Sequence, residues 1–479
     1  MNDKTTVENI SKPGEVKCDE LFILTQDMTK YDLMHESGKF VFEVILREDI
    51  WSPTLSGSVE VTDAVNAISK WPIRGGEVLV MKYRTSTFED KPANIIEKSF
   101  QIYSIENRKL NNDREQVYTL NFCSIEAISD QSRSITQAYG APGTVRTTDA
   151  IAEKIYIDHI QEYRRIDNPK TQTDFIIGDT PHTSKIQYTS NFWTPMQNMQ
   201  FISKKCQGNR HIGSDYVFYE SNKAFYLTSI QNLIQAQLDV GLFEEFVYAP
   251  PNLNVPVRGG GETFLGQQLP ESFSKIESIQ VPRTIDILDG QDSGYYSAST
   301  MAYDLFTKEQ AEVTLDGRDQ FSNFVHTDTG IPIPGGIQRN PYSFVNIKYL
   351  NQVMFTGMQG GLVDGKYGAA ANPAVLANNL FRQVYFNSFN DYTFEIDLPG
   401  RTDIEVGKLI KMVYPNAGDK PTDATYDDLV DPILTGNYLI TAIRHKFDRS
   451  RHTMKVEIVK NGLAASLGSI EDQVVGANL

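Results

Sequence analysis

The chain has 479 residues, too many for one hydrophobic core, and typical domain sizes predict roughly three domains. Hydrophobic residues make up 40% of it and aromatic residues 11%, which suffices to bury cores and excludes a disordered polymer. The 61 Asp and Glu outnumber the 45 Lys and Arg. The net charge of −16 disfavours general nucleic-acid binding, because phosphate contacts need concentrated positive charge.

Membrane, secreted and disulfide-stabilised proteins are also disfavoured. No apolar run reaches the roughly 18 residues of a membrane helix, so we expect no membrane insertion. The start of the chain, residues 1–6, lacks the apolar core of a signal peptide, so we expect the protein to stay where it is made. Three widely spaced cysteines favour a reducing compartment over disulfides or a zinc site: Cys18, Cys123 and Cys206.

Strand patterns dominate the first part of the chain. An almost wholly apolar run at 40–46 is typical of a strand covered on both faces. Alternation over 54–62 predicts a half-buried strand. Two further strands are predicted at 99–106 and 116–123, joined by a hairpin turn at Asn111–Arg114.

Helical patterns appear after residue 130. Thr147 or Thr148 can cap a helix whose isoleucines fall near one face: Ile151, Ile155 and Ile160. A clearer helix begins at Thr194, with Pro195 at its first position. Its apolar stripe precedes the stop signal Gly208 and comprises Met196, Met199, Ile202 and Cys206. An aromatic β-hairpin is predicted over 216–227.

Two glycine-rich stretches interrupt the second half of the chain. Residues 249–272 and 357–371 predict long loops or a domain seam. After the second stretch, Asn372 can cap a helix that Pro373 opens. Strands are predicted again over 391–460.

No motif for catalysis, a cofactor or a metal is present. The glycine run at 258–266 lacks the Gly-Lys-[Ser/Thr] of a phosphate loop, and no histidine pair has zinc-protease spacing. Asp286, Asp289 and Asp292 do not follow the calcium-loop pattern. We therefore predict no catalytic, cofactor-binding or metal-binding residues and no enzyme activity. His445 and His452 flank a predicted turn, where we expect solvated side chains.

Three stretches near the start of the chain have counterparts near its end. Gly, Met and Tyr share their spacing in 76–83 and 407–414. The other matches are 100–105 with 438–443, 117–122 with 454–458, and Val59–Val61 with Phe394–Ile396. A repeated β unit is typical of proteins that build rings and tubes from equivalent surfaces. Any two antiparallel hairpins also look alike at this level, so the pattern alone leaves both interpretations open.

These elements, in this order, resemble the baseplate hub protein of contractile-tailed bacteriophages, the T4-like tail hub, and the related hub part of type VI secretion spike proteins. The resemblance rests on the strand-rich region 18–128, on the helix from Thr194 with its following hairpin, on the proline-glycine to glycine-strand step at 399–410, and on the strand at 434–443. The region 280–345 resembles the inserted domain of such hubs.

The resemblance implies an α+β fold, mainly β, with two similar β-barrel-like tail-tube domains and inserted helical or mixed domains. The expected divisions are a flexible arm (1–17), a first tube domain (18–130), a helical or mixed inserted domain (131–215), a β-hairpin contributing to the second tube domain (216–248), an inserted middle domain with loops (249–372), the second tube domain (373–463) and a C-terminal tail (464–479).

The resemblance also implies a partner set and a place in the virion. A homotrimer would form a pseudo-sixfold ring, with apolar subunit interfaces and edge strands paired between neighbours. This ring would join the six-fold tail tube protein to a three-fold central spike protein and contact baseplate wedge proteins. It would be assembled in the bacterial cytoplasm. DNA would pass without specific binding, since an acidic wall repels phosphate. A docking strip for the spike is expected at Leu467, Ile470, Val474 and Val475.

Two alternatives stay open. A β-rich hydrolase or carbohydrate-binding tail component would need a deep pocket with converging carboxylates and aromatic residues such as Trp51, Trp71 or Trp193. The hub of a type VI-like secretion spike would need its β-helical needle as a separate protein, because no short regular repeats follow the last strands here.

Overall fold

The structure is a computed structural model, and its described residues are 13–34, 40–64, 66–70, 73–85, 95–139, 146–161, 174–179, 185–186, 188–208, 210–211, 213–241, 243–248, 274–304, 310–333, 340, 345–350, 373–416 and 430–464. The fold is mixed α and β, mainly strands, as predicted. One 14-stranded sheet contains strands from both the N-terminal and the C-terminal part of the chain. Among the described residues, no helix has the length and apolar character to cross a bilayer.

The N-terminal half-sheet contains six antiparallel strands in the order β3-β4-β7-β6-β5-β1, with β2 added beside β1. Their bounds are β1 Val16–Leu24, β2 Lys30–Asp32, β3 Phe40–Asp49, β4 Ser56–Asp63, β5 Val78–Thr85, β6 Ile95–Asn112 and β7 Glu115–Ser124. Burial alternates along β4 and β5, as the side-chain period of two requires, and the inward residues form one apolar cluster. The short helix α1 (Ala67–Lys70) follows β4.

The C-terminal half-sheet contains six strands in the order β17-β21-β24-β23-β22-β15. Their bounds are β15 Glu244–Tyr248, β17 Ser278–Arg283, β21 Tyr392–Pro399, β22 Leu409–Val413, β23 Gly436–Phe447 and β24 His452–Lys460. The two-residue strand β16 (Lys275–Ile276) pairs with β15 and leads directly into β17. Both strands lie within 249–372, the range expected to form an inserted middle domain, and both belong to this sheet.

The two half-sheets repeat the same strand order. Each strand therefore has a counterpart: β3 and β17, β4 and β21, β7 and β24, β6 and β23, β5 and β22, and β1 and β15. The four strand pairs from β3 to β5 and the four from β17 to β22 are all antiparallel. The last pair differs, because β1 is antiparallel to β5 whereas β15 is parallel to β22.

The register repeats as well. Gly76 donates its backbone N–H to the carbonyl of Ile102, and Gly407 donates in the same way to Ile440. Both glycines have positive φ, +97° and +83°, a backbone conformation that residues with a Cβ rarely adopt. A β-bulge follows each acceptor, between Ile102 and Ser104 and between Ile440 and Ala442. The aligned stretches 76–83 and 407–414 are therefore equivalent in structure.

One of the sequence matches is displaced by two residues. The cross-strand row Ile105–Leu120–Val59–Val44 corresponds to the row Ile443–Val456–Ile396–Ile279. Val59 is thus equivalent to Ile396 and not to Phe394. A two-residue slip keeps the same side chains on the same face, so the apolar-acid-apolar pattern could not reveal it.

A helical and mixed region lies between the half-sheets in the chain. It contains α2 Ile125–Gln131, β8 Ala138–Tyr139, β9 Arg146–Thr147, α3 Thr148–Ile155, a π-helical turn at Tyr156–Gln161, β10 Asp174–Ile177, β11 Lys185–Ile186, β12 Tyr188–Thr189, α5 Pro195–Ser203, β13 Tyr216–Glu220, β14 Ala224–Ser229 and α6 Ile230–Val240. Thr194 caps α5 with a complete capping box, which confirms the predicted helix start. The helix ends at Ser203, before the expected stop at Gly208.

The predicted hairpin at 216–227 is present as β13 and β14, but it pairs with β10 in a separate three-stranded sheet. Within 216–248, the strand that joins the C-terminal half-sheet is β15. The hairpin still contributes to the core of that half-sheet, through Val217 and Tyr219.

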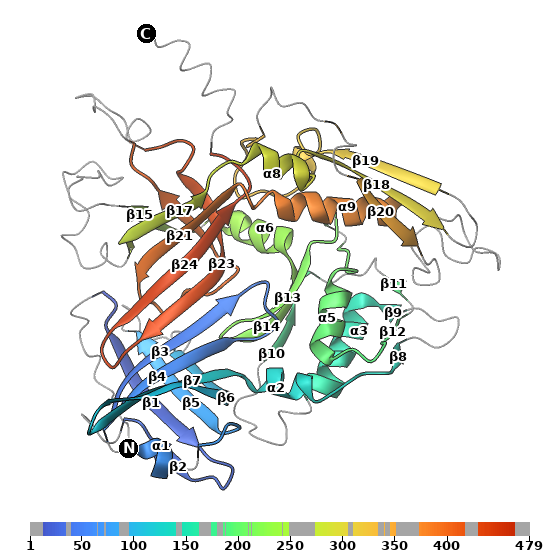
Figure 1. Cartoon of the computed structure of the whole chain (residues 1–479). Helices are drawn as coiled ribbons and strands as arrows, with labels where there is room; N and C mark the ends of the chain where they lie inside the picture. The colour runs from blue at the N-terminus through green and yellow to red at the C-terminus, as the bar shows by residue number, and fades with distance from the viewer. Residues whose placement is uncertain are drawn as a thin grey trace, which may run out of the picture.

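A smaller sheet and the long helix α9 (Pro373–Asn387) pack together beside the C-terminal half-sheet (Figure 1). The sheet contains β18 Ser297–Asp304, β19 Gln310–Asp316 and β20 Val345–Leu350, and the helix α8 (Ile287–Asp292) and a 3-10 turn at Phe321–Asn323 accompany it. The helix α9 begins at Pro373, as predicted.

Candidate assembly interface

The two half-sheets are joined by direct strand pairing. Residues 442–447, the distal half of β23, pair antiparallel with residues 44–49 of β3. The ribbon view shows β23 and β24 continuing beside β3 and β4 (Figure 1). Thr85 and Thr402 add a second link, because their hydroxyl oxygens lie 2.7 Å apart and Thr402 N donates to Thr85 Oγ1 over 2.8 Å.

Phe447 anchors this junction. It sits at the end of β23, yet it belongs to the apolar cluster of the N-terminal half-sheet and is 0% exposed. Its ring stacks on Tyr83 of β5, with ring centroids 4.5 Å apart. One side chain of the C-terminal half-sheet therefore completes the core of the N-terminal half-sheet.

The tip of the β23–β24 hairpin also reaches the opposite edge of the N-terminal half-sheet. Val16 at the start of β1 donates to the carbonyl of Ser450 over 3.2 Å, and His452 N donates to the carbonyl of Gly14 over 2.7 Å. The hairpin thus bridges the outer strands β3 and β1. Along residues 44–49 the edge of β3 is therefore not open for pairing with another chain.

Buried polar groups lie inside this junction. His445 Nδ1 lies 3.0 Å from His452 Nε2, and His445 Nε2 lies 3.2 Å from Glu48 Oε1. All three side chains are buried, and Asn222 also donates to Glu48. Burial, reinforced by the neighbouring His445, lowers the pKa of His452 well below its ordinary value. The expectation that His445 and His452 are solvated is wrong, because the strand ends that carry them pair with β3 and with Gly14 of the N-terminal half of the chain.

A buried ion pair ties the N-terminal half-sheet to the β13–β14 hairpin. Lys98 Nζ lies 2.6 Å from Glu220 Oε1, with side-chain exposures of 6% and 0%. Ser124 Oγ and the Leu55 backbone N–H donate to the other carboxylate oxygen over 2.5 and 3.1 Å. This carboxylate therefore has partners at both oxygens, as a buried charge requires.

The β6–β7 hairpin is the counterpart of the β23–β24 hairpin, but its distal half is exposed. Burial along β6 stops after Ile105, and every residue from Glu106 to Asn112 is exposed. Leu110 near the tip is 79% exposed. No described strand pairs with the outer edge of this part of β6.

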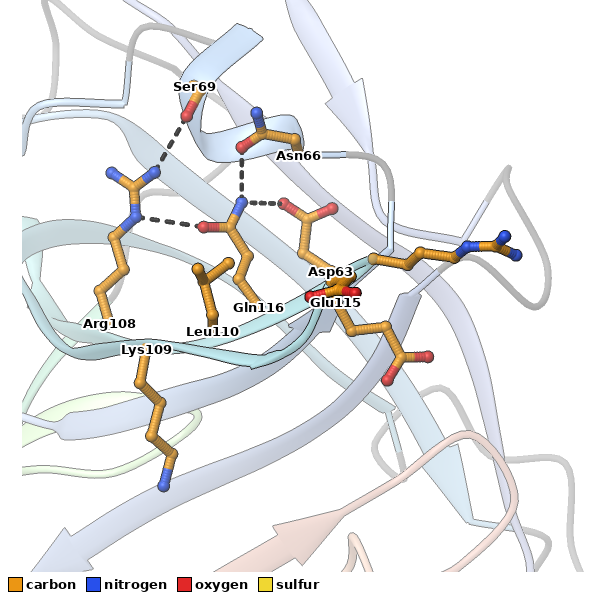
Figure 2. A pocket seen from close by; sticks show the side chains of 10 residues that line it. Asp63, Asn66, Ser69, Arg108, Lys109, Leu110, Glu115 and Gln116 are labelled. Atoms are coloured by element: carbon orange, nitrogen blue, oxygen red, sulfur yellow. Dashed lines mark hydrogen bonds between the residues drawn. The ribbon is translucent and has the colours of Figure 1, made fainter.

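Polar contacts fix the base of this exposed hairpin (Figure 2). Arg108 donates to Ser69 of α1 over 2.9 Å and to Gln116 over 3.2 Å. Gln116 in turn donates to Asp63 and Asn66 over 3.2 and 2.7 Å. These residues line a pocket of about 480 Å³ that contains no aromatic side chain.

The spike-docking residues expected from the sequence, Leu467, Ile470, Val474 and Val475, lie outside the described residues. The same holds for Trp71 and for both glycine-rich stretches, 249–272 and 357–371. Trp51 and Trp193 are partly exposed and do not line the pocket of Figure 2. Within the described ranges, no group of three or more His, Cys, Asp or Glu could hold a metal ion.

Cys18, Cys123 and Cys206 are free thiols; Cys18 is half-buried and the other two are buried. Burial raises the pKa of Cys206 to about 12, so this thiol stays protonated and unreactive at neutral pH.

No protein-family model and no curated protein sequence matches the chain. Solved structures do match. The 43 kDa tail protein of prophage MuSo2 from Shewanella oneidensis is 8% identical and matches 92% of this chain and 98% of its own, with a TM-score of 0.51. A tail protein from Neisseria meningitidis MC58 is 10% identical, with coverages of 93% and 99% and a TM-score of 0.49.

A type VI secretion component of E. coli, itself structurally similar to the T4 tail proteins gp27 and gp5, is 10% identical. It matches 88% of this chain and 73% of its own, with a TM-score of 0.37. The match with the Shewanella protein confirms the predicted resemblance to phage tail proteins at the level of the fold.

Proposed function

We propose that the chain is the structural hub of a contractile phage-tail baseplate. The two half-sheets are two copies of one tail-tube module, each a closed or nearly closed barrel. The repeated strand order and register support this, because six strands follow in the same order and one β-bulge lies at the same place in β6 and β23. As a hub, the protein has no enzymatic role and belongs to the tail of the virion.

In this proposal three chains form one ring. Two similar modules in each subunit give a pseudo-sixfold annulus, which presents six near-equal contacts to the tail tube and three equal ones to the spike. The helical region and the α9 region lie outside the modules, toward the wedge proteins. DNA passes through the ring without specific contacts, which fits the net charge of −16.

The oligomeric state tests this function. Light scattering on the purified chain is expected to give three times the monomer mass of 54.0 kDa. Electron microscopy of the particle along its axis is expected to show six similar densities around a central hole. A chain that stays monomeric at high concentration contradicts the hub.

A further inference from the structure

The distal halves of the two equivalent hairpins have different surroundings. In β23 this segment pairs with β24 on one side and with β3 on the other. In β6 it pairs with β7 on one side, and no described strand lies on the other. Unpaired strand edges are ready templates for another strand, so proteins generally cover them. The β23–β24 hairpin shows how such an edge is covered within this fold.

The register identifies the counterpart of Phe447. Phe447 is opposite His452 on β24, and Leu110 is opposite Gln116 on β7. Phe122 and Ile458 are equivalent in the repeated register. Gln116 precedes Phe122 by as many residues as His452 precedes Ile458, so Gln116 and His452 are equivalent too. Leu110 therefore occupies the position of Phe447. Phe447 is fully buried in a neighbouring half-sheet, whereas Leu110 is almost fully exposed in the single chain.

The surface that would receive Leu110 is present on the same chain. The strand β3, which receives Phe447, has β17 as its counterpart, and Val44 opposite Phe447 corresponds to Ile279. The described strands include no partner for the outer edge of β17. Ile279 packs against the apolar cluster of the C-terminal half-sheet, and Val281 beside it is 43% exposed.

We propose that the distal β6–β7 hairpin pairs antiparallel with β17 of a second copy of this chain. This inference rests on the proposed function and specifies its subunit contact. Leu110 then lies opposite Ile279 of the second copy, and Lys109 lies opposite Gln280, as Lys446 lies opposite Ile45 within one chain. The contact uses two different surfaces of the chain, so it is heterologous and closes into a ring when the rotation permits.

The strand that pairs with β6 belongs to a second copy of this chain, because the pairing of β23 with β3 within one chain already shows the same contact. The C-terminal hairpin already covers the edge of the N-terminal half-sheet, so one hairpin and one edge per chain are left over. If the free hairpin of one copy pairs with the free edge of the next, equivalent contacts within and between chains alternate around the ring. The tip contact with β1 is not expected to repeat, because β16 already pairs with β15 at the corresponding place.

A substitution that introduces a charge at position 110 tests the proposed contact between the β6–β7 hairpin and β17. In Leu110→Asp the concentration at which half the chains are trimeric is expected to rise at least about tenfold, because a charge replaces a central apolar anchor. The matched control is Leu288→Asp on α8, where the leucine is 75% exposed and belongs to neither half-sheet. The control is expected to assemble like wild type. Circular dichroism and the melting temperature of each variant report whether the monomer fold is intact.

Cysteine pairs test the register. Residues directly opposite in antiparallel strands have Cα atoms about 4.5–5.5 Å apart, which suits a disulfide. A Lys109→Cys chain mixed with a Gln280→Cys chain is expected to form a covalent dimer under mild oxidation. A chain carrying both substitutions is expected to give dimers and trimers. The matched control replaces Gln280→Cys by Gln310→Cys, which puts the thiol on an exposed glutamine position of β19.

The outcomes separate the two proposals. A monomeric wild type overturns the hub and this contact together. A trimeric wild type that stays trimeric as Leu110→Asp, with no 109–280 disulfide, overturns the contact alone and leaves the hub standing. Loss of the trimer in a folded Leu110→Asp chain, together with the 109–280 disulfide, supports the contact.

Discussion

His445 and His452 face each other in the junction between the two half-sheets, with Nδ1 of the first 3.0 Å from Nε2 of the second. Such a pair is compatible with one shared proton between the rings but not with two charged rings, because like charges repel strongly in a buried site. Glu48 at the far side of His445 orients that ring. A second charge at this junction, on His452, would therefore be unfavourable.

Acid is expected to destabilise the chain. Burial lowers the pKa of His452 well below its ordinary value and that of His326 to about 4. Between these lowered values and about 6.5, the two histidines bind more protons in the unfolded chain than in the folded chain, so their contribution to the free energy of unfolding falls as the pH falls. Melting temperatures measured from pH 8 to pH 5 are expected to decline below about pH 6.5. The decline is expected to be shallower in His452→Gln, and an unchanged slope in that variant contradicts the role of the pair.

Phe447 is expected to be one of the most sensitive apolar residues of the fold. Phe447→Ala removes a fully buried ring from the core of the N-terminal half-sheet, which costs about 3–5 kcal/mol of the free energy of unfolding. The matched control is Phe192→Ala, because this phenylalanine is 72% exposed and exposed sites usually change stability by less than about 0.5 kcal/mol. Chemical denaturation measures both. Equal losses in the two variants would show that Phe447 does not anchor the junction.

The ion pair between Lys98 and Glu220 is expected to show strong coupling. Lys98→Met leaves the buried carboxylate without its cation and is expected to cost about 3–5 kcal/mol. The double variant Lys98→Met, Glu220→Gln is expected to cost less than Lys98→Met alone, since no uncompensated charge remains. Denaturation midpoints of the wild type, both single variants and the double variant complete the cycle. Simple additivity of the single losses would argue against a functional pair.

The sequence predicted the local features of this fold better than its long-range contacts. The cap at Thr194 and the turn at Asn111–Arg114 depend on neighbouring residues and are present in the structure. The burial of His445 could not be predicted, because its partner Glu48 lies 397 residues away. For the same reason β17 was missed. Its pairing with β21 crosses a long segment, and Pro282 within it weakens the strand pattern.

Leu110 illustrates the difference between a residue type and its role. Its sequence context is a polar turn, where a single exposed leucine needs no explanation. Only the register, which aligns it with Phe447, gives it significance. The repeat was visible in the sequence at the paired strands, but β6 contains an additional bulge between Glu106 and Lys109. That bulge shifts the alignment by one residue and hides the correspondence.

The contacts at the base of the β6–β7 hairpin are expected to hold its outer edge ready for pairing. Arg108→Ala removes hydrogen bonds to Ser69 and Gln116 and is expected to reduce stability by no more than about 1 kcal/mol, because the side chain is exposed. Its larger effect is faster amide hydrogen exchange over 106–112, since the distal strand is then less well fixed. Arg114→Ala at the tip is the matched control, because the hydrogen bond described for Arg114 comes from its backbone N–H to Asn112 and not from its guanidinium. Exchange rates over 106–112 that are the same in both variants would mean that the pairing with β7 alone holds the hairpin.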